Sequence, residues 1–87
     1  MRESTIEKKA VQLAKQKGYL TFKFVSPNNR GVPDRMFIKE GVVFFIEFKA
    51  KDKKPTLLQY EIIRQIDAQG VKVYVVDDVK DLEGVLC

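Results

Sequence analysis

Apolar residues recur at helical spacing near the start of the chain, which predicts a first helix. The spaced positions before Gly18, which is suited to end the helix, are Ile6, Ala10, Leu13 and Ala14. Ser4 and Glu7 fit a capping box, in which each side chain would bond to the other residue's backbone amide. A second helix is expected to begin near Thr56, with Gln59 completing another capping box, and to stop at Gly70.

Four other segments have the pattern of strands. They cover residues 19–25, 34–39, 42–49 and 71–76. The third of them is apolar on both sides until Glu47, so we expect it in the centre of the sheet. Residues 26–33 and 50–55 are predicted loops. Residues 77–87 are predicted to form a short terminal helix, with Leu82, Val85 and Leu86 packing inward. The order α-β-β-β-α-β predicts an α/β fold with a mixed central sheet flanked by helices, in which the last two strands run parallel.

The turn between the second and third strands predicts which residues face each other. Glu40 and Gly41 form a two-residue connection, so paired residue numbers should sum to 81. This register places Asp34 directly opposite Glu47, with Cβ atoms about 4.5–5.5 Å apart on one face. Lys49 lies two residues beyond Glu47 and therefore on the same face.

Two carboxylates in this position would weaken a protein selected only for stability. They repel each other, and the end of the most apolar strand adds a cost of desolvation. A divalent cation between them would remove the repulsion, and ligands that are all oxygen suit Mg²⁺ or Mn²⁺. The alternative is that Asp34 caps a turn while Glu47 and Lys49 are solvated residues at a strand end.

Composition excludes several other kinds of chemistry. The chain has 87 residues and is expected to form a single domain over residues 1–87. It contains no histidine. Catalytic triads that need histidine and histidine-bound zinc are therefore excluded. The single cysteine, Cys87, allows no internal disulfide. The longest apolar run, Val42 to Ile46, is far shorter than the roughly 20 residues of a membrane span. We therefore expect a soluble cytoplasmic protein, which would lie in the cytoplasm of the host cell if a phage encodes it.

The sequence around the acidic pair resembles a nuclease signature. Pro33-Asp34, followed after twelve residues by Glu47-Phe48-Lys49, resembles the PD-(D/E)XK motif. The wider segments GVPDR, from Gly31, and FFIEFKAKDKKPTLLQ, up to Gln59, are similar to the VRR-NUC family of virus-type replication-repair nucleases, in its compact stand-alone phage form. The resemblance extends from the first helix to the fourth strand.

This resemblance implies roles for particular residues. Asp34 and Glu47 would be metal ligands, together with the carbonyl oxygen of Phe48. Lys49 would orient or deprotonate the attacking water and offset charge on the phosphate. The cofactor would be Mg²⁺ or Mn²⁺.

Two further residues have two possible roles each. Glu7 matches an acid on the first helix that lies near the metal in the family, but it also fits the capping box. Gln59 matches a glutamine that supports the lysine or the water, but it too fits a helix cap.

We expect the DNA backbone to be contacted from two loops beside Asp34. Asn29 and Arg30 lie on one loop, and Lys51, Lys53 and Lys54 lie on the other. Flexible basic side chains beside a metal site suit phosphate binding that does not depend on sequence, and the net charge of +4 suits an anionic partner. The alternative is that these lysines only keep a loop solvated.

The leading interpretation is a metal-dependent endonuclease for branched, Holliday-junction-like DNA in phage replication, recombination or repair. Stand-alone members of the family resemble two-fold junction resolvases, so we expect a homodimer, with an interface at the tail residues Val85 and Leu86 or at the hairpin. No small-molecule substrate and no membrane partner are expected. The alternatives are a nuclease for flaps, nicks or plain duplex, a nucleic-acid-binding module without turnover, and a small structural or inhibitor protein.

Overall fold

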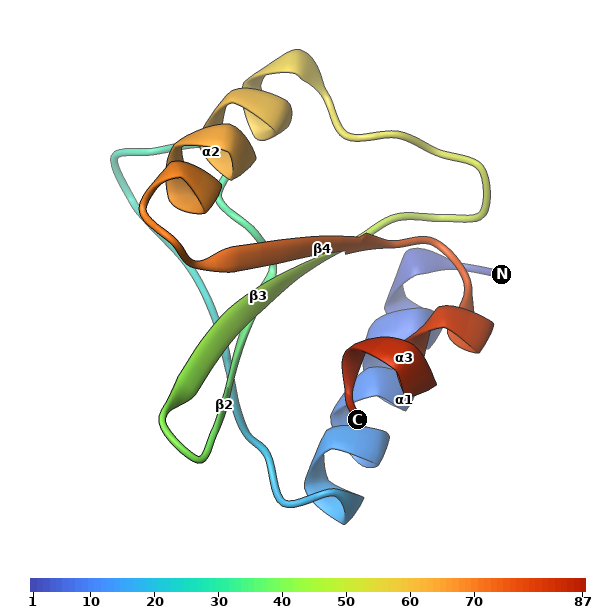
Figure 1. Cartoon of the computed structure of the whole chain (residues 1–87). Helices are drawn as coiled ribbons and strands as arrows, with labels where there is room; N and C mark the ends of the chain where they lie inside the picture. The colour runs from blue at the N-terminus through green and yellow to red at the C-terminus, as the bar shows by residue number, and fades with distance from the viewer.

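The structure, a computed structural model that describes all 87 residues, is a four-stranded sheet with helices on both faces (Figure 1). The strands lie in the order β1-β2-β3-β4; the first three are antiparallel, and β4 runs parallel to β3. This confirms the expected α/β fold. The elements are α1 (Glu3–Gln16), β1 (Leu20–Lys23), β2 (Arg35–Lys39), β3 (Val42–Phe48), α2 (Leu57–Ala68), β4 (Lys72–Val76), the 3-10 helix η1 (Val79–Asp81) and α3 (Leu82–Val85).

The hairpin between β2 and β3 has the predicted register. Glu40 and Gly41 both have positive φ angles, 52° and 81°, as a two-residue turn between antiparallel strands requires. Pairing continues without a break to Arg35 opposite Ile46, so the paired numbers sum to 81. The sequence around the turn therefore determines which side chains meet at the far end of the hairpin.

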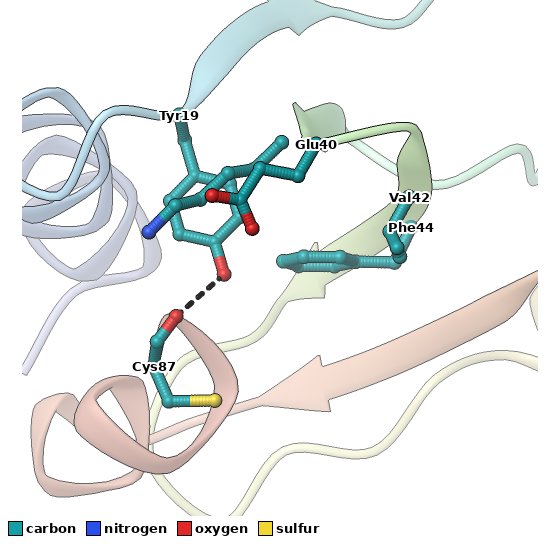
Figure 2. A pocket seen from close by; sticks show the side chains of 6 residues that line it. Tyr19, Glu40, Val42, Phe44 and Cys87 are labelled. Atoms are coloured by element: carbon teal, nitrogen blue, oxygen red, sulfur yellow. Dashed lines mark hydrogen bonds between the residues drawn. The ribbon is translucent and has the colours of Figure 1, made fainter.

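The main core lies between the sheet and the helices α1 and α3, which cover the same face in Figure 1. Figure 2 shows how the end of the chain is held there: the Tyr19 hydroxyl donates to the Cys87 carbonyl oxygen over 2.9 Å. The Tyr19 ring also packs edge-on against Phe44, with centroids 5.7 Å apart. The core residues are Ile6, Ala10, Ala14, Phe37, Phe44, Ile46, Phe48, Val76, Leu82 and Leu86.

Helix α2 covers only part of the opposite face. It packs against β4, at one edge of the sheet, and none of its residues is fully buried. On β1, at the other edge, Leu20 and Phe22 are each 53% exposed. The alternating pattern of β1 correctly predicted an apolar side, but no element of the chain covers that side. One 12-residue helix is too narrow to span four strands.

Two expectations about the chain ends are wrong. Helix α1 begins one residue earlier than the predicted cap, at Glu3, and Arg2 precedes it without a side-chain capping bond, so Ser4 and Glu7 form no capping box. Leu86 is fully buried and Val85 packs against the core, so the apolar tail does not offer an interface. No helix combines the length and the apolar character needed to cross a membrane.

Candidate active site

Asp34 and Glu47 lie where the β2–β3 pairing ends. Asp34 immediately precedes β2, and one step beyond Arg35 and Ile46 in the observed register places it opposite Glu47, as predicted. The Asp34 carboxylate is anchored there, because its Oδ2 accepts a hydrogen bond from the Phe48 backbone amide over 2.8 Å.

Pro33 explains why the backbone ladder stops at this point. The next pair in the register would be Pro33 and Phe48, and proline has no N–H to donate. Pro33 and Phe48 occupy a hydrogen-bonded position of the antiparallel ladder, where the N–H and C=O of each residue point at the residue opposite. The Phe48 amide is therefore satisfied by Asp34, while the Phe48 carbonyl faces a residue that cannot donate to it. The proline leaves a backbone oxygen free beside the two acids.

The Glu47 carboxylate is buried, with a side-chain exposure of only 2%. Its Oε2 accepts a hydrogen bond from the Gln59 side-chain amide over 3.0 Å, and Lys49 Nζ lies 3.4 Å from the same oxygen. The other oxygen, Oε1, is buried and has no hydrogen-bond partner. Buried carboxylate oxygens are normally paired, so this oxygen is available to a further partner such as a cation or a water molecule.

Burial and like charge shift the ionisation of both acids. Burial raises the pKa of Glu47 to about 7, with a further contribution from the Asp34 charge, while Lys49 acts in the opposite direction. Burial also raises the pKa of Asp34, although the bond from the Phe48 amide opposes this. The Asp34 charge therefore disfavours the charged form of Glu47, as their predicted opposition implied.

Gln59 has both of the positions that the sequence suggested. Its side-chain Oε1 accepts from the Thr56 backbone amide over 2.9 Å, and the Thr56 hydroxyl accepts from the Gln59 backbone amide over 3.2 Å. These two bonds confirm the second capping box. Its Nε2 donates to Glu47 at the same time. A single side chain therefore links the start of α2 to the buried carboxylate.

Glu7 is held by cations. Its Oε2 accepts from Arg35 Nε over 2.8 Å and lies 3.3 Å from Lys23 Nζ. Glu7, Asp34 and Glu47 do not form a cluster of three acidic side chains in the structure, where Glu7 is paired with the two cations instead. Its charge still reaches the site, because it contributes to the raised pKa of Asp34.

Sequence reasoning considered Arg35 only as a less certain contact to DNA, and it did not predict that Arg35 and Lys23 pair with Glu7. Lys23 and Arg35 face each other across β1 and β2. That register depends on how the loop of residues 26–33 folds, and no tight turn predicted it. The only signal in the sequence was the position of Arg35, directly after Asp34.

The loops predicted to contact DNA lie on both sides of the N-terminal end of α2. Residues 26–33 approach that end at Gly31, where a Cβ atom would lie 3.1 Å from Leu58 Cγ. Residues 50–55 lead directly into α2. Lys51 pairs with Asp78 over 2.9 Å, so part of its charge is already neutralised. The predicted residues that form no ion pair are Arg30, Lys53 and Lys54.

Known proteins share both this sequence and this fold. A protein named "Putative nuclease p44", from Acyrthosiphon pisum secondary endosymbiont phage 1, is 40% identical over 87 residues, covering 99% of this chain and 92% of that protein. A solved structure described as a VRR_NUC domain superposes with a TM-score of 0.89 at 26% identity, covering 97% of this chain and 92% of the other. No protein-family model matches the chain.

Proposed function

The chain belongs to the VRR-NUC family of PD-(D/E)XK nucleases, in its phage type, and on that premise we propose that it is a Mg²⁺- or Mn²⁺-dependent endonuclease that cuts branched DNA. The observation that carries the proposal is the Glu47 carboxylate, which is buried beside Asp34 and Lys49 with one oxygen left unpartnered. Such an arrangement is unfavourable in the free protein and becomes favourable when a cation is bound.

The available oxygen donors fit a hard divalent cation. Glu47 Oε1, the Asp34 carboxylate and the Phe48 carbonyl would hold the ion, with water in the remaining positions. These groups are all oxygen, as Mg²⁺ and Mn²⁺ prefer. Because the chain contains no histidine and its only cysteine is exposed elsewhere, a softer metal has no better site. When bound, the ion would lower the pKa of a water molecule and neutralise charge on the phosphate.

Lys49 and Gln59 would complete the site from the protein side. The Lys49 side chain is mostly buried and its ammonium lies 3.4 Å from Glu47, so it supplies a positive charge fixed near the phosphate to be cut. It would orient the attacking water or take up its proton. Gln59 holds Glu47 Oε2 and so leaves Oε1 as the free ligand atom.

We assign Glu7 a supporting electrostatic role. Its carboxylate is occupied by Arg35 and Lys23, so it would act on the site by charge and not as a direct ligand. A direct role would require these two ion pairs to break when DNA or metal binds.

The substrate is proposed to lie across the end of the sheet, between the two loops. Arg30 and Asn29 would contact the backbone from one side, and Lys53 and Lys54 from the other, with Lys51 contributing less because Asp78 holds it. The sequence contains nothing that resembles a base-reading helix, so we propose recognition of DNA shape over recognition of base sequence. Because DNA is the substrate, we place the activity in the cytoplasm of the host cell, in phage DNA replication, recombination or repair.

A second copy of the chain would give two such sites in one particle. The uncovered apolar surface formed by Leu20 and Phe22 on β1 and Val43 on β3 is the best candidate for the interface. Leu20 pairs with Ile38 of β2, and Ile38 pairs with Val43, so these residues lie on the same face of the sheet although β2 separates β1 from β3. Two-fold pairing is the symmetry that cutting of both strands at a junction requires.

The decisive experiment compares DNA structures and metals. Four-way junction, flap, nicked and linear duplex DNA are incubated with Mg²⁺, Mn²⁺ or EDTA, using the natural protein and Glu47→Gln. Glu83→Gln, at an exposed glutamate paired with Lys17, is the matched control. We expect metal-dependent cutting, fastest on the junction, that is lost only in Glu47→Gln.

The other outcomes separate the alternatives. Preference for a flap, a nick or a duplex would retain the nuclease and replace its substrate. Binding without cutting under every condition would contradict the catalytic proposal and favour a nucleic-acid-binding module.

A further inference from the structure

A basic cleft lies on the side of the sheet opposite α2. It is shallow and open to solvent, has a volume of about 400 Å³, and lies between one face of α1 and the cross-strand pair Lys23 and Arg35 of β1 and β2. The charged residues that line it are Glu7 and Lys8 from α1, and Lys23 and Arg35 from the strands. None of the loops assigned above to DNA contributes to it.

The lining has a net positive charge. Three cations, Lys8, Lys23 and Arg35, face one acid, Glu7, which leaves a net charge of +2 (three minus one). Lys8 forms no ion pair within the chain. Glu7 does not cancel the site, because a single carboxylate cannot neutralise three cations, and an anion in the cleft would still be attracted.

The Arg35 side chain is held in place by two hydrogen bonds, and some of its N–H donors remain unused. Its Nε is bonded to Glu7 over 2.8 Å, and its Nη1 is bonded to the Thr21 hydroxyl over 3.4 Å. Nη2 makes no hydrogen bond within the chain. A guanidinium that is fixed by two neighbours and retains free N–H groups is suited to bind a phosphate with little loss of side-chain freedom.

The cleft is adjacent to the candidate active site. Arg35 follows Asp34 directly in the chain, so their side chains leave opposite faces of the sheet at the same end. The charges of Glu7 and Lys23 both act on the Asp34 carboxyl group. A DNA strand that crosses the end of the sheet past Asp34 would therefore meet this cleft next.

We propose that the cleft formed by Lys8, Lys23 and Arg35 is a second phosphate-binding site, which holds the backbone of the DNA strand on the side of the cut away from the lysine loop. This inference rests on the proposed function for its substrate. It adds a binding site on α1 and β1, elements to which the nuclease motif assigns no DNA contact. The chemistry recognised is the phosphodiester group, so binding should not depend on base sequence.

The chain provides a matched pair of variants for the test. Lys8 and Lys9 are neighbours on α1, and both are exposed and free of ion pairs. A step of one residue turns the helix by about 100°, and only Lys8 lines the cleft. Lys8→Gln and Lys9→Gln therefore each remove one positive charge from the same helix. Only Lys8→Gln removes that charge from the cleft.

Binding is measured by fluorescence anisotropy with labelled single-stranded and four-way junction DNA, in EDTA, over a series of salt concentrations. Lys8→Gln should weaken binding about threefold to tenfold at low salt and reduce the slope of log K against log salt by about 0.7–0.9. Lys9→Gln should change affinity less than twofold. Thermal melting should show both variants folded, with Tm within about 2 °C of the natural protein.

The two proposals fail in different ways. Equal binding by Lys8→Gln and Lys9→Gln, in a protein that cuts DNA, would overturn the cleft and leave the nuclease standing. A protein that never cuts, but that loses affinity only in Lys8→Gln, would support the cleft and contradict the nuclease. Titration with inorganic phosphate, followed by the NMR signal of the Arg35 Nε–H group, should shift that signal; a signal that stays fixed with both phosphate and DNA would also overturn the cleft.

Discussion

Gln59 and Glu47 are joined by a hydrogen bond that also depends on the start of a helix. The Gln59 amide nitrogen donates to Glu47 Oε2 over 3.0 Å, while its carbonyl oxygen accepts from the Thr56 backbone over 2.9 Å. The helix cap therefore determines which way the amide points, and the amide determines which oxygen of Glu47 is left free. A local feature of α2 in this way sets the geometry of the candidate metal site.

Replacing Gln59 separates these two effects. Gln59→Glu should keep the capping box, because glutamate also fits it, but it places a further carboxylate beside Glu47, in addition to Asp34. We expect a loss of about 1–2 kcal/mol in unfolding free energy at pH 8, smaller at pH 5, and a fall in cleavage rate of about 10–100-fold. Gln59→Ala should lose about 1–3 kcal/mol at pH 8, because it removes the cap bond and also leaves Glu47 Oε2 without the Gln59 donor. Chemical denaturation at the two pH values measures this, and full activity in Gln59→Glu would contradict it.

The raised pKa of Glu47 predicts that the metal-free protein is more stable in mild acid. The folded pKa is about 7 and the reference value is 4.5, so between these values the folded protein binds more protons than the unfolded chain. Its unfolding free energy should therefore fall as the pH rises from 4.5 to 7, by on the order of 2–3 kcal/mol, and stay low above pH 7. Denaturant melts in EDTA across this range measure the change.

Glu47→Gln is the control for that pH dependence, because glutamine does not titrate. Its stability should vary much less over the same range and should exceed that of the natural protein at pH 8. Mg²⁺ should raise the Tm of the natural protein at pH 8 and leave that of Glu47→Gln nearly unchanged. An identical pH profile in the two proteins would show that Glu47 is not the titrating group.

Asparagine and alanine at position 34 should behave differently in the metal-free protein. Asp34→Asn removes the charge but keeps an oxygen that can accept from the Phe48 amide, so the fold should be as stable as the natural one or more so. Asp34→Ala leaves that amide without its partner and should cost about 1–3 kcal/mol. Both should abolish cleavage. Melting curves in EDTA distinguish the two, and a loss above roughly 2 kcal/mol in Asp34→Asn would count against this account.

Gly31 and Gly18 allow the effect of backbone strain to be separated from that of a close contact. Both have positive φ, 88° and 84°, but a Cβ atom meets other atoms only at Gly31, where it would lie 3.3 Å from the Gln59 amide nitrogen. Each alanine variant should lose about 1–2 kcal/mol from backbone strain. Gly31→Ala should lose a further 1 kcal/mol or so and also reduce cleavage, since it displaces the start of α2. Equal activity in the two variants would show that this approach does not position the site.

The exposed apolar side of β1 predicts where two copies meet. Light scattering at micromolar concentration should give twice the 10.0 kDa mass of the chain, and Phe22→Lys should give a monomer. Val42→Lys, at a residue of the hairpin that is 62% exposed, tests the other candidate interface and should leave the dimer intact. A natural protein that runs as a monomer would remove the dimer altogether.

Local sequence was sufficient for much of the site. The turn at Glu40 and Gly41 forces one register on β2 and β3, and the opposition of Asp34 and Glu47 follows from counting along it. The capping box of Thr56 and Gln59 involves residues three apart, so it too could be read directly. These features depend on covalent spacing and on conformational preferences within a few residues, which the sequence contains in full.

Other features depend on residues that only folding brings together. Glu7 was expected to cap its own helix or join the metal, yet it binds Arg35, 28 residues away, because a nearly buried carboxylate gains more from two cations than from an exposed helix end. The apolar character of Leu86 suited both inward packing and an interface, and the fold buries it in the core. The sequence by itself determined the fold class and the acidic pair. Tertiary structure decided the remaining contacts, because they depend on how far each helix covers the sheet, which no local pattern encodes.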